Sequence, residues 1–209
     1  MNKDDQFNNL NGQQPMIRIP ETVQPVQYTK LDIVLEHIYA SIQMISTECN
    51  SFSVHVVTMA CRELLLNLAH QKGIELEWDH RRFVKPQFWN QYRQKSVLAY
   101  NYFKHADRDP DALYNGPSYG NLAHLNDAQT LFNISGYHSL GRKPTGPMAH
   151  FSVAMMLLYP QYFKMDFLDE YPEHKRQYQS VPKERSVVLS ALRSSLLASK
   201  YLPRIPEFD

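Results

Sequence analysis

Cysteine is scarce in this chain, and its scarcity excludes two kinds of site. Only Cys49 and Cys61 occur among the 209 residues, and they form neither a C-x-x-C pair nor the spacing of a zinc knuckle. Two cysteines are too few for the disulfide framework of a small secreted protein. We therefore expect a protein that folds in a reducing compartment.

Long apolar runs are also missing. No segment of the sequence approaches the roughly 18 apolar residues that cross a bilayer, and the first 28 residues lack the apolar core of a signal peptide. The sequence therefore predicts a cytoplasmic protein with no membrane partner.

Complete catalytic and metal-binding signatures are absent as well. The sequence has no H-E-x-x-H helix, and no strand pattern precedes Gly116-Pro-Ser118-Tyr-Gly120, as a G-x-S-x-G elbow requires. The stretch 136–143 looks like a phosphate-binding loop, but Arg142 follows the second glycine where Lys is needed, so we predict a helix-ending turn. The carboxylates from Asp107 to Asp111 alternate as in a calcium loop, yet Ala112 replaces the required glycine. We predict neither a cofactor nor a bound metal.

What is present favours an ordered helical body. Hydrophobic residues make up 43% of the chain and aromatic residues 12%, which is enough for a core. Residues 1–27 are different, because they are rich in Asn, Gln and Pro and contain few large apolar side chains. We predict a disordered N-terminal arm over 1–27 and a single helical domain over 28–209.

Hydrophobic residues at helical spacing identify the elements of this domain. Thr29 is the predicted N-cap of the first helix, with Asp32 completing a capping box. No alternating pattern typical of strands persists anywhere in the sequence. The predicted fold class is all-α, a single compact bundle of about five to seven helices, with helices over 29–46, 51–73, 85–105, 122–137, 147–159 and 182–201.

Three of these helices have apolar positions that we expect to face the core. In helix 51–73 they include Val54, Val57, Cys61, Leu64, Leu65 and Leu68. In helix 85–105 they are Phe88, Trp89, Tyr92, Leu98, Tyr102 and Phe103. In the last helix they are Val187, Val188, Leu192, Leu196 and Leu197.

The charge is unevenly distributed, although the net charge of the chain is only +1. Segment 80–108 contains seven basic residues against one acidic residue, together with several aromatic rings. Such a segment can attract phosphates and stack exposed bases. It indicates RNA as a candidate partner, while the alternative is a solvated basic face whose aromatic residues belong to the core.

Polar residues gather where helix 85–105 ends. Asn101 and His105 lie four positions apart and therefore share one helix face, with Lys104 beside them. A neutral imidazole there could remove a proton while Asn101 orients a substrate and Lys104 stabilises negative charge. The candidate catalytic residues are thus Asn101, Lys104 and His105, and the candidate binding residues are Glu63, Asp107, Arg108 and Asp109. The alternative is structural, because His and Lys suit the carbonyl end of any helix.

Two resemblances involve these residues. The stretch from Ala60 to Leu65, with the later stretch Asn101-Tyr-Phe-Lys-His-Ala-Asp-Arg-Asp-Pro110, resembles a group of bacterial proteins of unknown activity that share an N-[FY]-F-K-H-A-D-x-D-P motif. The same stretch is similar to HEPN domains, helical bundles that often act as metal-independent ribonucleases through an R-x(4-6)-H motif. Here Tyr100 occupies the position of the catalytic arginine. The HEPN resemblance implies a homodimer whose two motifs face each other.

The missing arginine favours a binding or regulatory helical module without catalytic activity. The first alternative is a HEPN-like, metal-independent ribonuclease that uses His105. The second is a metal-dependent hydrolase built around His105 and Asp107. Each interpretation gives the histidine a different role, so one substitution separates them.

For the non-catalytic module we expect no RNA cleavage by the wild-type protein, and a loss of roughly 1–3 kcal/mol in unfolding free energy for His105→Ala, because buried polar partners lose their bonds. Thermal unfolding and RNA cleavage with and without a chelator test this. Cleavage that persists in chelator and disappears in the variant would instead identify the ribonuclease, and cleavage lost in chelator would identify the hydrolase.

Overall fold

The computed structural model describes residues 27–76, 84–104, 111, 113–114 and 121–198. Within these ranges every regular element is helical, which confirms the all-α prediction. The elements are α1 (Lys30–Ser46), α2 (Ser51–Gln71), α4 (Pro86–Lys104), α6 (Leu122–Ser139), α7 (Gly146–Leu158), the short 3₁₀ helix η2 (Asp166–Glu170), α8 (Pro172–Gln179) and α9 (Arg185–Ala198). The predicted arm lies almost entirely outside the described residues.

Helix α1 begins as its sequence predicts. The Thr29 hydroxyl accepts a hydrogen bond from the Asp32 backbone N–H at 3.2 Å, and the Asp32 carboxylate accepts one from the Thr29 N–H at 2.8 Å. This reciprocal pair is a capping box that satisfies two N–H groups at the helix start. The buried face of α1 then consists of Val34, Ile38, Ile42 and Ile45.

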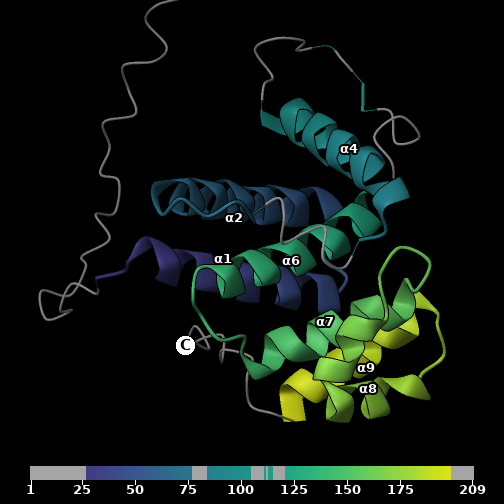
Figure 1. Cartoon of the computed structure of the whole chain (residues 1–209). Coiled ribbons are helices and arrows are strands. Elements are labelled where there is room, and N and C mark those ends of the chain that lie inside the picture. Colours follow the sequence, from purple (N-terminus) through teal and green to yellow (C-terminus); the bar gives the residue numbers. More distant parts are fainter. Residues whose placement is uncertain (1–26, 77–83, 105–110, 112, 115–120, 199–209) are drawn as a thin grey trace, which may run out of the picture.

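Helices α1, α2 and α6 lie side by side through the centre of the bundle (Figure 1). A glycine permits the close approach of α2 and α6. A Cβ atom added at Gly136 would lie 3.3 Å from a methyl carbon of Leu65 and 3.4 Å from one of Leu76. Gly136 is therefore a packing position inside α6. The turn predicted over 136–143 begins only after Ser139, where α6 ends, and Gly141 in this turn has a φ of +84°.

The C-terminal helices form a second layer below α1 and α6 (Figure 1). Helix α7 is apolar on all sides and nearly all of its residues are buried, which is typical of a helix enclosed by others. Helices α8 and α9 cover it. The sequence prediction assigned no element between 160 and 181, whereas the structure has η2 and α8 there.

Helix α4 lies at the edge of the bundle, against α6 and α2 (Figure 1). The segment before it pairs with the segment after α7, because Val84 and Phe163 form an isolated antiparallel bridge. The Lys85 backbone N–H donates to the Tyr162 carbonyl at 2.9 Å, and the Lys85 ammonium donates to the Pro160 carbonyl at 3.3 Å. These bonds fix one end of α4 relative to α7.

Several predicted core positions are wrong at the periphery. Leu98 in α4 is 51% exposed and Leu197 in α9 is 57% exposed. Part of the apolar pattern of each helix therefore faces solvent. Val57 in α2 is half-buried. Helix α9 begins at Arg185, three residues after the predicted start at Pro182, and residues 199–201 of the predicted helix lie outside the described ranges.

Among the described helices, α2 has the length and apolar composition of a membrane span, which the sequence analysis did not anticipate. In the structure it is a core helix. It packs against α1, α4 and α6 and buries polar side chains, including His55 and Thr58.

Leu65→Ala should lower the unfolding free energy by about 2–5 kcal/mol, because Leu65 is 2% exposed and fills the contact between α2 and Gly136 of α6. Denaturant unfolding measures the loss. The matched control is Leu98→Ala, whose side chain faces solvent and which should cost less than about 1 kcal/mol. Equal losses in the two variants would contradict the assigned core.

Candidate ligand pocket

Of the predicted site residues that the structure describes, Lys104 and Glu63 lie in contact. The Lys104 ammonium lies 3.1 Å from a carboxylate oxygen of Glu63, and both side chains are nearly half exposed. Lys104 also lies 5.3 Å from the ring centre of Tyr100. Asn101 is exposed on α4. The other predicted site residues lie outside the described ranges: His105, Asp107, Arg108 and Asp109.

The aromatic residues near this predicted site pack against one another. Phe103 and Tyr114 stack with ring centres 5.4 Å apart, and Phe52 meets both rings edge-on at 5.3 and 5.5 Å. Tyr102 lies 5.3 Å from Tyr114. These contacts join the end of α4 to the start of α2, so the rings form a local cluster.

The aromatic residues of the predicted RNA-binding segment at the start of α4 are also engaged within the fold. Trp89 is only 8% exposed, and the Tyr92 hydroxyl donates to the Gln129 amide oxygen at 2.7 Å. Phe88 meets Tyr162 edge-on, with ring centres 5.0 Å apart. Helix α4 therefore directs these rings toward α6 and the segment after α7.

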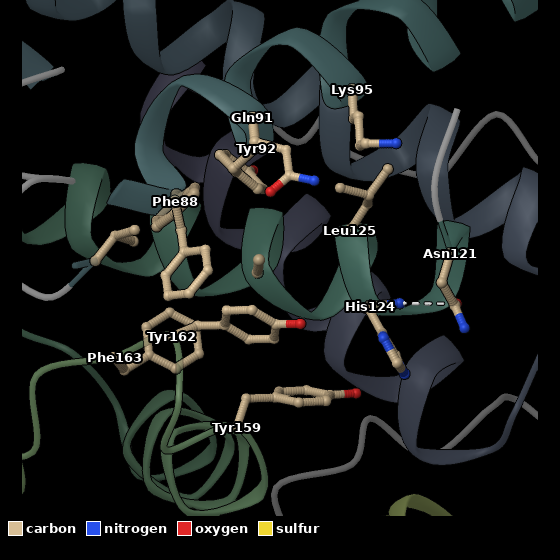
Figure 2. A pocket seen from close by; sticks show the side chains of 13 residues that line it. Phe88, Gln91, Tyr92, Lys95, Asn121, His124, Leu125, Tyr159, Tyr162 and Phe163 are labelled. Atoms are coloured by element: carbon tan, nitrogen blue, oxygen red, sulfur yellow. Dashed lines mark hydrogen bonds between the residues drawn. The ribbon is translucent and has the colours of Figure 1, made fainter. Parts of the chain in front are cut away.

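A cavity of about 290 Å³ lies in this region (Figure 2). One wall comes from α4, where Phe88, Tyr92 and Lys95 follow helical spacing. A second wall comes from α6, and a third from the end of α7 and the residues after it. The volume lies at the lower end for small-molecule sites. The described lining residues are Val84, Phe88, Gln91, Tyr92, Lys95, Asn121, His124, Leu125, Ala128, Phe132, Tyr159, Tyr162 and Phe163.

The aromatic walls of the pocket are held by ring contacts and buried hydrogen bonds. The rings of Tyr92 and Phe132 meet edge-on at 4.5 Å. Behind Tyr92, the Gln129 amide nitrogen donates to the Asn133 oxygen at 2.9 Å, and the Asn133 amide donates to the Thr58 carbonyl at 2.8 Å. Burial raises the pKa of the Tyr92 phenol, so it stays protonated and remains a donor. This chain of hydrogen bonds connects Tyr92, at the pocket wall, to the backbone of α2.

Polar side chains line the pocket on two helices, and Gln91 of α4 is one of them (Figure 2). Lys95 comes from α4, while Asn121 and His124 come from the start of α6. The Asn121 side-chain oxygen accepts hydrogen bonds from the backbone N–H groups of Ala123 and His124, at 3.1 and 3.3 Å. This N-cap fixes the amide so that its NH₂ group is the end left for other partners.

A buried ion pair lies behind Tyr159. Asp127 on α6 is completely buried, and one of its oxygens accepts hydrogen bonds from the Tyr159 hydroxyl at 2.7 Å and the Arg185 Nε at 2.9 Å. Its other oxygen accepts a bond from the second Arg185 nitrogen at 2.9 Å. Burial, followed by the nearby carboxylate, raises the pKa of the Tyr159 phenol. The phenol is therefore a proton donor held in place at the pocket wall.

His124 is exposed at the rim, but one side of its ring lies 5.0 Å from the Tyr159 ring. Desolvation lowers the pKa of His124, with a further lowering from Arg185 and an opposing effect of Asp127. His124 is therefore neutral at pH 7 and has one N–H donor and one acceptor nitrogen.

Metal ligands do not gather in the described part of the chain, where no group of three or more His, Cys, Asp or Glu side chains has suitable geometry. The metal-dependent alternative involves His105 and Asp107, which lie outside that part, and it stays a prediction.

No family model, curated protein or solved structure matches this chain. The pocket is therefore interpreted from its own geometry. The sequence analysis placed Phe88 and Tyr92 on the core face of helix 85–105 and included them, with Lys95, in the segment considered for RNA binding, but it did not predict a pocket. It missed Asp127, although this is the one acidic residue of α6 and a lone acid on an apolar helix signals a buried partner.

Arg185→Met should lower the unfolding free energy by about 3–5 kcal/mol, because it leaves the buried Asp127 carboxylate without its cation. Denaturant unfolding measures the loss. Arg193→Met, on the exposed face of the same helix, is the matched control and should cost less than about 1 kcal/mol. Adding Asp127→Asn to the Arg185 variant should recover part of the stability, and a further additive loss would contradict the pairing.

Proposed function

We propose that this protein is a non-catalytic binding module that holds a small, largely apolar ligand in the pocket between α4, α6 and the end of α7. The observation that carries the proposal is the cavity itself, whose aromatic walls are held in place by contacts within the fold. Concave sites with mostly apolar walls and a few polar groups are the usual form of small-ligand sites.

The shape of the pocket favours a flat ligand of one or two rings. Phe88 and Tyr162 present one aromatic surface and Tyr92 with Phe132 another. Rings pack well against such surfaces in offset or edge-to-face geometry. Because the walls are already ordered by the hydrogen bonds behind Tyr92 and Tyr159, little conformational entropy is lost when a ligand enters.

The composition of the lining supports binding rather than catalysis. None of the thirteen described lining residues is Asp, Glu, Ser, Thr or Cys, the usual nucleophiles and carboxylate bases. The hydroxyls of Tyr92 and Tyr159 already donate to internal acceptors. His124 is the one histidine among the described lining residues, and none of those residues is a carboxylate that could partner it.

The ribonuclease alternative depends on His105, outside the described residues, and stays a prediction, as does the homodimer that it implies. The described part of segment 80–108 supports the pocket better than an RNA surface, because Phe88, Tyr92 and Lys95 face the cavity.

A neutral two-ring probe, 2-naphthamide, should bind the wild-type protein with a dissociation constant on the order of 0.1–1 mM, the range expected for a ligand of this size. Two-dimensional NMR measures binding, and the shifted amide signals should belong to the lining residues. Ala128→Phe should abolish binding by filling the cavity, whereas Ala198→Phe, at the exposed end of α9, should not.

Tyr162→Ala provides a second variant that removes an aromatic wall without placing bulk in the core, since Tyr162 is 39% exposed. It should weaken 2-naphthamide binding about tenfold. Shifts spread over the surface, or unchanged affinity in both pocket variants, would contradict the proposed site.

A further inference from the structure

We infer that the ligand of this pocket is an uncharged aromatic nitrogen heterocycle of the size of a purine base, bonded to the Gln91 amide, the His124 imidazole and the Tyr162 hydroxyl. This inference rests on the proposed function and names the chemical class of its ligand. The observation behind it is that each of the three walls of the cavity carries an uncharged hydrogen-bonding group (Figure 2).

These three side chains are available to a ligand. The Gln91 amide, the His124 ring nitrogens and the Tyr162 hydroxyl line the cavity and form no hydrogen bond within the described part of the chain. In contrast, the hydroxyls of Tyr92 and Tyr159 donate to internal acceptors. The available groups come from α4, from α6 and from the segment after α7, so every wall keeps at least one of them.

The charge of the lining favours an uncharged ligand. Lys95 is the one cation among the described lining residues and already takes part in an interaction within the chain, and none of those residues is acidic. His124 is neutral at pH 7, because desolvation lowers its pKa. A charged ligand would lose its hydration on entering the cavity without meeting a free opposite charge. The lining therefore selects against ions of either sign.

The same three groups favour a ring that both donates and accepts hydrogen bonds. A glutamine amide, a neutral imidazole and a tyrosine hydroxyl can each act as donor and as acceptor. A hydrocarbon ring would displace water from these groups and leave them unpaired, which costs binding free energy. A purine carries nitrogen atoms around its whole perimeter, so it can bond to groups on separate walls at the same time.

The volume and the aromatic walls limit the size of the heterocycle. A cavity of about 290 Å³ takes one or two rings. Phe88 and the pair of Tyr92 and Phe132, whose ring centres lie 4.5 Å apart, provide apolar surfaces for such a ring. A nucleotide would add phosphates, for which the described lining offers no unengaged cation. The pocket therefore matches a base without its phosphates.

Three probes of nearly equal shape vary the hydrogen-bonding atoms of the ring. Indole has an N–H donor and no ring acceptor, benzimidazole adds an acceptor nitrogen, and purine adds further acceptors. We expect the wild-type protein to bind purine about tenfold more tightly than indole, with benzimidazole between them. Benzimidazole-5-carboxylate should bind less tightly than benzimidazole, because its charge meets no free partner. Calorimetry at pH 7 measures the four affinities.

Gln91→Met and Tyr162→Phe remove a hydrogen-bonding group and keep the size of the side chain. Each should weaken purine binding about fivefold and leave indole binding within about twofold. The matched control is Gln94→Met, which lies exposed on α4 outside the described lining and should leave the affinity for purine unchanged.

Three results would overturn the heterocycle while 2-naphthamide binding upholds the pocket: equal affinities for purine and indole, tighter binding of the carboxylate than of benzimidazole, or unchanged purine binding in both variants. Failure of purine, indole and 2-naphthamide alike to bind the wild type would overturn both proposals. Tighter binding of oligoadenylate, per base, than of free purine would assign the pocket to RNA in place of a small heterocycle.

Discussion

A single carboxylate that is shielded from water, Asp127, determines how three parts of the bundle meet. A buried charge is tolerated only with good hydrogen-bonding partners, and Asp127 has them from the end of α7 and the start of α9. Arrangements that move Arg185 away leave the charge uncompensated and are strongly disfavoured. The position of α9 relative to α6 is therefore fixed by the ion pair between Asp127 and Arg185 as well as by apolar packing.

The same carboxylate shapes the pocket on its other side. Tyr159 donates to Asp127 and presents its ring to the cavity, so the ion pair orients a pocket wall. Tyr92 is oriented in a comparable way by the amide relay through Gln129 and Asn133 to α2. Polar groups within the core thus hold aromatic side chains whose faces are available to a ligand.

Helical periodicity predicted most of the helices because apolar residues recur at helical spacing in them. The Thr29 cap and the buried Leu65 follow directly from the local sequence pattern. The pattern failed for η2 and α8, which are too short to show a period, and for Leu98 at the bundle edge. The pocket was harder to predict, since its residues come from segments 84–95, 121–132 and 159–163. Only their tertiary contacts show that Lys95 and His124 share a cavity, so no local motif could reveal it.

The distance along the sequence between the pocket walls has a thermodynamic consequence. A molecule held between α4, α6 and the residues after α7 is a noncovalent cross-link among segments that separate when the chain unfolds. Because it binds the folded state alone, it shifts the folding equilibrium by mass action, by about 2.7 kcal/mol at a hundred times its dissociation constant. Helix α4, at the edge of the bundle, forms one wall of the cavity, so a bound ligand would add contacts that hold this helix in place.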